Sequence, residues 1–293
     1  MQRKNDRPHL KRKLQLLLMI SLVMIGLALL FYPSVSSWYN DQFQIRAVVT
    51  YDENVNKLSK EHMDEQMAEA HQYNETLTNY GITDPFIPGG NTELSKTYTS
   101  ILNVNNGIMG SIEIPKINVN LPIYHGTSAR VLEKGVGHME MTAFPIGGEG
   151  GHSVLTGHTA LPNATLFTNL DKLVEGDVFY IKVYKEIFAY QVDQITVVKP
   201  DNTKPLMPQS GQDYVSLVTC TPYAVNSHRL LVRGVRIPYE PEEYAEQVDN
   251  ALPISIPYEL IIALIVAAGL IILILVQFWF NHRKNRHDLK SKG

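Results

Sequence analysis

Two long runs of apolar residues, one near each end, divide the chain into three regions. The first run, residues 14–31, contains no charged residue and only two polar side chains. The second run, residues 260–280, is more apolar still and ends in an aromatic cluster. A helix needs about 20 apolar residues to cross the roughly 30 Å hydrocarbon core of a bilayer. The pattern therefore predicts two transmembrane helices, at residues 14–32 and 258–280.

Basic residues gather outside both apolar runs. The tails at residues 1–13 and 281–293 carry eleven Lys and Arg but only two acidic residues. Because an excess of Lys and Arg marks the cytoplasmic side, both termini are predicted to be cytoplasmic, with residues 33–257 outside the cell membrane. The alternative is that the first run is a cleaved signal peptide. Its apolar core is longer than the roughly 7–15 residues of a signal h-region, which favours a retained anchor.

Between the membrane segments the pattern changes from helical to extended. Residues 33–80 are largely polar, with apolar side chains close to helical spacing, and predict a helical extension. Residues 81–104 contain closely spaced Gly and Pro and predict a loop. Residues 105–238 contain short alternating runs rich in Val, Ile and Tyr, with one helix or helical turn expected at 164–176. This pattern is typical of a mainly β domain, an antiparallel barrel or sandwich, and residues 239–257 resemble a linker back to the membrane.

Charge and cysteine content exclude several function classes. Outside the two tails the chain has 15 basic and 27 acidic residues, a net charge of about −12. Nucleic-acid binding needs a basic surface, so a nucleic-acid partner is not expected. The chain has a single cysteine, Cys220, which excludes an intrachain disulfide and metal sites built on several cysteines.

Cys220 lies where a predicted strand ends, because the following Thr221-Pro222 turns the chain. A free cysteine is often a buried apolar residue, but one at a strand end is also a candidate nucleophile. If the strand ending at Cys220 pairs with the next one, Arg229 lies beside the thiol. A guanidinium there favours thiolate and donates to a developing oxyanion. The alternative for Arg229 is a surface ion pair.

A cysteine nucleophile also needs a proton donor and acceptor, most often histidine. The β-rich region contains five histidines, and the spacing of residues does not choose among them: His125, His138, His152, His158 and His228. No HxH or HExxH pattern is present to suggest a metal site, and no cofactor is expected.

Three short motifs together resemble the sortases, the cysteine transpeptidases of Gram-positive cell surfaces. They are TGH at 156–158, TCTPY at 219–223 and RLLVRG at 229–234. The likeness covers residues of about 105–237. The upstream DPF at 84–86, the helical extension and the second apolar run make the chain look like the pilus-assembling class C branch. Thr159-Ala160 departs from the Arg-Gly that often follows this histidine in class C.

The resemblance implies a fold, an active site and a reaction. The fold would be a closed β-barrel of about eight strands. Cys220 would be the nucleophile, His158 the general acid and base, and Arg229 the oxyanion stabiliser. Asp84, Pro85 and Phe86 would form a lid, with the carboxylate pairing with Arg229 and the ring covering Cys220.

The implied partners are pilins and the membrane. The thiolate would cleave an LPxTG-like sorting signal, and a lysine amine of another pilin would then form an isopeptide bond. One alternative is a housekeeping sortase that attaches proteins to the cell wall. Another is a non-catalytic β-domain that binds a partner and in which Cys220 only fills the core. A papain-like protease is disfavoured because the helical domain that would carry its cysteine is absent from the pattern.

Overall fold

The chain forms two compact units. The computed structural model describes residues 7–77, 82–84, 86, 94–250 and 258–290. The first unit combines Met1–Trp38 with Ser255–Gly293, and the second is Tyr39–Ile254.

The first unit contains the apolar helices. Helix α1 extends over Arg7–Val55, and its part from Leu17 onward includes a window long and apolar enough to cross a membrane. Helix α6 extends over Tyr258–Lys290, but its apolar stretch, Ile261–Gln277, is shorter than a typical span. Within the described ranges, therefore, only the first of the two predicted spans reaches full spanning length, which indicates an N-terminal membrane anchor.

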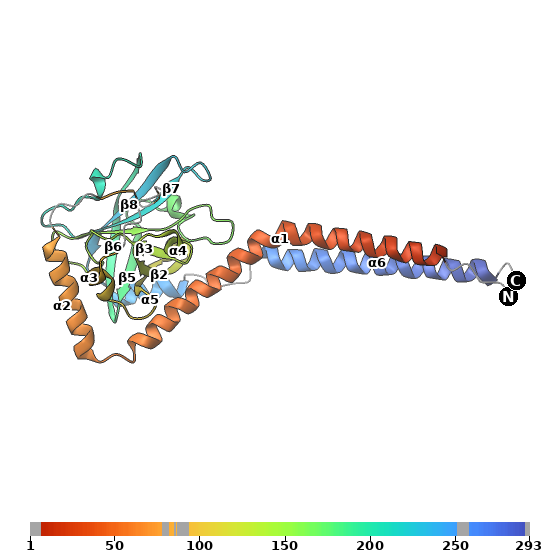
Figure 1. Ribbon diagram of the computed structural model, residues 1–293, viewed down its shortest axis with the longest axis horizontal. Coiled ribbons are helices and arrows are strands. Elements are labelled where there is room, and N and C mark those ends of the chain that lie inside the picture. Colours follow the sequence, from red (N-terminus) through yellow and green to blue (C-terminus); the bar gives the residue numbers. More distant parts are fainter. Residues whose placement is uncertain (1–6, 78–81, 85, 87–93, 251–257, 291–293) are drawn as a thin grey trace. The chain divides into compact units, whose positions relative to one another are not determined.

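The second unit contains a closed barrel of eight strands (Figure 1). The strands lie in the order β1-β2-β3-β4-β7-β8-β6-β5 around the barrel. The pairs β2–β3 and β4–β7 are parallel, and the other six pairs are antiparallel. The strand bounds are β1 Ile108–Ile114, β2 Val119–His125, β3 Val136–His138, β4 His152–Thr156, β5 Val178–Val183, β6 Glu186–Val198, β7 Tyr214–Thr221 and β8 His228–Ile237. The predicted mainly β fold, a closed mixed barrel of eight strands, is confirmed.

Short helices surround the barrel. Helix α2, Lys60–Thr76, begins after its cap Ser59, whose hydroxyl accepts from the His62 backbone N–H at 3.2 Å. It buries Met63, Met67 and Ala70 in the core. This apolar stripe holds α2 along one side of the barrel (Figure 1). The other helices of this unit are α3 Lys96–Ser100, α4 Ala129–Leu132 and α5 Pro241–Asn250, and the 3₁₀ turns are η1 Pro115–Ile117, η2 Leu170–Lys172 and η3 Lys204–Leu206. The predicted helical extension is confirmed over the end of α1 and over α2.

The helix or helical turn expected at residues 164–176 is the single 3₁₀ turn η2, because Leu166 and Phe167 pack into the core from irregular backbone before it. The expected linker, residues 239–257, contains helix α5. The start of α5 matches helix rules, since Pro241 is the first helical residue and acidic side chains fill the first turn.

Candidate active site

Two hydrogen bonds hold the ends of β4 and β7 together. The two strands run parallel, with Thr156 opposite Val218. His158 and Cys220, each two positions further along the chain, therefore lie at the same end of the barrel. The Thr219 hydroxyl donates to the carbonyl of Gly157 at 2.7 Å, and the Gly157 N–H donates to the carbonyl of Val218 at 3.0 Å. The TGH and TC motifs, 62 residues apart, therefore form one structural element.

The next strand brings the guanidinium to the same place. Strands β7 and β8 are antiparallel with Cys220 directly opposite Arg229. Side chains alternate between the two faces of a strand. Leu217 and Val232 belong to the barrel core, whereas Val218 and Leu231 lie in a separate outer cluster. Cys220, two residues after Val218, therefore faces outward, and Arg229, two residues before Leu231, does too.

An apolar surface extends along the outside of the barrel from this end. We call it the outer patch; its residues are Met139, Val154, Val198, Leu206, Val218 and Leu231. Ile82 and Phe86, which come from the segment between α2 and α3, pack against it. The outer patch is thus a covered apolar floor leading away from Cys220.

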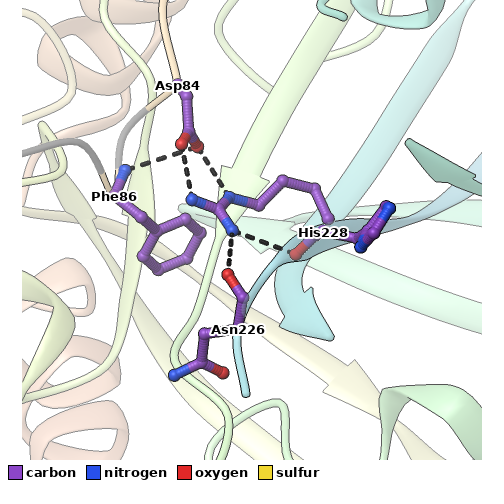
Figure 2. A network of polar contacts seen from close by, with 5 residues as sticks. Asp84, Phe86, Asn226 and His228 are labelled. Carbon is purple, nitrogen blue, oxygen red and sulfur yellow. Dashed lines mark hydrogen bonds and ion pairs between the residues drawn. The ribbon is translucent and has the colours of Figure 1, made fainter. Parts of the chain in front are cut away.

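Asp84 makes a two-pronged ion pair with Arg229 (Figure 2). Arg229 Nε donates to Asp84 Oδ1 at 2.8 Å and Nη2 donates to Oδ2 at 2.6 Å. Both side chains are nearly excluded from solvent, with exposed fractions of 2% for Asp84 and 9% for Arg229. The remaining nitrogen, Nη1, donates to the carbonyls of Asn226 and His228 at 3.0 Å each. The guanidinium is therefore held fixed by the β7–β8 connection and by one carboxylate from the upstream segment.

Phe86 contacts both His158 and Arg229. Its ring centroid is 5.4 Å from that of His158 and 5.0 Å from the Arg229 guanidinium carbon. The Asp84–Arg229 pairing expected from the resemblance is therefore present, and Phe86 contacts His158 and Arg229. Pro85, the third expected lid residue, lies outside the described residues.

Burial keeps the thiol and the imidazole neutral in this arrangement. Burial raises the pKa of Cys220 to about 11; Arg229 opposes this rise and the negative charge of Asp84 adds to it. Burial also lowers the pKa of His158, against an opposing influence of Glu133. The covered site therefore holds little thiolate at neutral pH, and its nucleophile is weak.

The other histidines occupy different places. His138 is fully buried: its Nε2 donates to the Ala143 carbonyl at 2.8 Å and its Nδ1 accepts from the Tyr98 hydroxyl at 2.9 Å. His152 is also buried and accepts from the Ser216 hydroxyl at 2.8 Å. The remaining two are His125, bonded to two backbone carbonyls, and His228, bonded to Ser227. Within the described ranges, no three His, Cys, Asp or Glu residues gather to hold a metal ion.

Comparison with known proteins identifies the family. The model of the sortase domain matches residues 112–237. Sortase D of Bacillus subtilis is 32% identical over 149 residues, which cover 50% of this chain and 72% of that protein. The chain belongs to the sortase family. It is therefore a cysteine transpeptidase.

Solved structures of similar sortases refine the comparison. Sortase C of Streptococcus pneumoniae is 44% identical, covers 66% of this chain and 97% of its own, and has a TM-score of 0.62. The pilus-related sortase C of Group B Streptococcus is 47% identical, covers 64% of this chain and 96% of its own, and has a TM-score of 0.61. The structural neighbours at 40–47% identity are class C sortases.

Sequence reasoning missed three features of this site. The Thr219–Gly157 hydrogen bond, the two carbonyls that bind Arg229 and the outer patch all depend on strand register. The available signal for the outer patch was the loss of alternation in β4, β7 and β8, because strands that are buried on both faces carry near-continuous apolar runs.

Proposed function

We propose that this sortase assembles pili, joining pilin subunits through a lysine isopeptide bond. The observation that carries the proposal is its likeness to class C pilus sortases at 40–47% identity, over nearly the full length of those chains. The curated sortase A relatives are only 24–27% identical. The contacts of Asp84 and Phe86 with Arg229 and His158 support the same branch, because they match the lid that the resemblance implies.

The reaction would proceed in two acyl-transfer steps. The Cys220 thiolate attacks the Thr–Gly carbonyl of an LPxTG-like sorting signal, and Arg229 stabilises the charge that develops on the carbonyl oxygen. His158, as imidazolium, protonates the departing glycine amine, and the peptide bond breaks to leave a thioester on Cys220. A pilin lysine amine then attacks this thioester, with neutral His158 accepting its proton, and the thiol is released.

Asp84, Pro85 and Phe86 would act as a lid in this cycle. With the lid closed, Arg229 is neutralised by Asp84 and the thiol has its raised pKa, so the enzyme is at rest. Withdrawal of the lid frees the guanidinium for the oxyanion and rehydrates the thiol and imidazole. The charge of Arg229 then favours thiolate, and the site becomes competent for attack.

The membrane arrangement completes the proposal. We infer that α6 forms a second span beside the N-terminal anchor, because its apolar stretch is followed by the basic tail at residues 281–293. Both termini would then be cytoplasmic and the barrel extracellular. Anchoring on the outer face raises the local concentration of pilins that arrive through the membrane.

Mass spectrometry of the full chain in detergent tests the function. After incubation with an LPxTG-containing pilin peptide, we expect a thioacyl adduct on Cys220, and transfer to a pilin lysine when an acceptor domain is added. Cys220→Ala should abolish the adduct, and His158→Ala should slow its formation by about 10²–10⁴-fold. Transfer to a cell-wall peptide amine but not to pilin lysine would instead favour a housekeeping role.

A further inference from the structure

The last turns of α1 are fixed to the barrel within the second unit. The Tyr51 hydroxyl donates to the Met109 carbonyl at 3.1 Å and accepts from the Tyr184 backbone N–H at 2.7 Å. Asp52 adds an ion pair with Lys182 at 2.8 Å. The buried side chains of this part of α1 recur at helical spacing, at Gln44, Val48, Tyr51 and Val55. One face of the helix therefore packs on the barrel framework.

The same part of α1 also binds the segment that follows β4. We call this segment, residues 157–169 between β4 and η2, the histidine loop, because it carries His158. Asn40 Nδ2 donates to the Asn163 carbonyl. The Asp41 carboxylate accepts from the Thr165 backbone N–H and, at 3.5 Å, from the Thr165 hydroxyl. The helix that is fixed to the barrel framework thus also holds the histidine loop.

Two contacts carry the position of the histidine loop to His158. The Phe167 N–H donates to the His158 carbonyl at 3.1 Å. The fully buried Phe167 ring also packs directly on Gly157, since a Cβ added to Gly157 would lie 2.7 Å from the ring. Thr165 is only two residues before Phe167, so the residue that Asp41 binds and the residue that holds His158 share one short stretch of backbone.

The residue between them is in a conformation that its surroundings must maintain. Leu166 has a φ of +39°, in the left-handed region that a leucine rarely adopts. Such a conformation persists only where contacts on both sides hold it. On one side, Asp41 binds Thr165, and on the other, Leu166 and Phe167 pack into the core. Loss of the Asp41 contacts therefore lets the backbone relax at Leu166 and shifts the support of His158.

We infer that Asp41, assisted by Asn40, is a positioning residue that holds His158 where its imidazole can protonate the departing amine. The inference rests on the proposed function, which assigns proton donation to His158. It adds that the helix beginning in the membrane anchor also sets the position of the proton donor.

A pair of donor substrates tests this inference with the full chain in detergent. One donor is an LPxTG-like peptide, and the other is its ester, with oxygen in place of the nitrogen of the Thr–Gly bond. An amine must be protonated to leave, whereas an ester leaving group needs less help from a proton donor. The measurement is the rate of release of the leaving half, after subtraction of the rate with Cys220→Ala. The ratio of the amide rate to the ester rate reports proton donation and does not depend on the fraction of active enzyme.

His158→Ala sets the scale of the effect. It should slow release from the amide by about 10²–10⁴-fold and from the ester much less. Asp41→Ala should lower the amide-to-ester ratio about tenfold, because it misplaces the imidazole without removing it. Asp41→Asn should keep most of the ratio, because its side-chain oxygen still accepts from the Thr165 N–H. Asn40→Ala, which removes only an exposed hydrogen bond, should lower the ratio by a smaller factor.

The matched control is Asp52→Ala. It removes an ion pair between the same helix and the barrel without touching the histidine loop, so the amide-to-ester ratio should stay at its unmodified value. An unchanged ratio in Asp41→Ala, or an equal fall in Asp52→Ala, overturns the positioning role and leaves the proposed function intact. If Asp41→Ala does not fold, an unchanged ratio in Asn40→Ala overturns the positioning role instead.

Two other outcomes reach further than the positioning role. A ratio that stays unchanged in His158→Ala removes proton donation from His158 and overturns the inference with it. Absence of release from both donors overturns the proposed function and the inference together.

Discussion

Asp84 neutralises the guanidinium beside the only thiol of the protein. Its two hydrogen bonds to Arg229, 2.8 and 2.6 Å long, are made with both side chains nearly excluded from water. The same carboxylate adds to the rise in the pKa of Cys220. Asp84→Asn keeps the size of the side chain and removes its charge. The variant should therefore lower the pKa of Cys220, because Arg229 then acts on the thiol without opposition.

The magnitude follows from the thiolate fraction. With a pKa of about 11, about one thiol in ten thousand is ionised at pH 7. Each unit by which the pKa falls raises this fraction about tenfold. Because burial is the largest cause of the raised pKa and Asp84 the smallest, we expect the pKa of Cys220 to fall by up to about one unit in Asp84→Asn, hence up to about tenfold faster alkylation. Adding Phe86→Ala should rehydrate the site and raise the alkylation rate further. The upper limit is a gain of about 300-fold, which corresponds to a fall in the pKa of Cys220 from about 11 to the unperturbed value near 8.5.

The assay is iodoacetamide labelling of the full chain in detergent between pH 6 and 10, with the Cys220 peptide quantified by mass spectrometry. The matched control is Asp193→Asn, which removes a similar ion pair with Arg233, whose Nη2 lies 2.6 Å from the carboxylate. This control should label like the unmodified chain. If Asp84→Asn and the double variant also label at the unmodified rate, with the same pH profile, Asp84 does not govern the thiol and the lid mechanism is refuted.

Three further predictions concern the framework of the site. Thr219→Val removes the hydrogen bond to the Gly157 carbonyl and should slow thioacylation about tenfold while the melting temperature, measured alongside, stays within a few degrees; an unchanged rate would contradict a positioning role. Tyr98→Phe should lower the free energy of unfolding by about 1–3 kcal/mol in denaturant titrations, whereas the exposed Tyr223→Phe should have no effect. Burial lowers the pKa of His138 to about 3, while an unfolded imidazole titrates near 6.5. The unfolded state therefore binds the proton first, and the free energy of unfolding should fall as pH drops from about 6.5 towards 3, by up to about 1.4 kcal/mol per unit. Equal stability at pH 7 and 4.5 would contradict this.

Several features of the fold were predictable because they depend on local pattern. Alternating Val, Ile and Tyr between turns predicted most barrel strands, and the uncharged run near the N-terminus predicted the anchor. One short element escaped prediction. Strand β3 has only three residues, too few for an alternation to be recognised.

The residues of the site likewise differ in how far the sequence predicts their positions. Cys220 and Arg229 were brought together by the sequence itself, since two strands joined by a short connection pair as neighbours, and their register places the two residues opposite each other. The choice of His158 among five histidines rested on the TGH motif. Spacing cannot supply it, because the parallel β4–β7 pairing joins segments 62 residues apart.

What the sequence by itself determined is therefore the local chemistry: a membrane-anchored β domain with one strand-end thiol and a guanidinium across from it. Only the tertiary structure decided what surrounds that thiol. The Asp84–Arg229 pair spans 145 residues, and the outer patch combines side chains from strands, a loop and η3. Such contacts arise when barrel closure fixes the strand order, and it is they that bury the thiol and raise the pKa of Cys220.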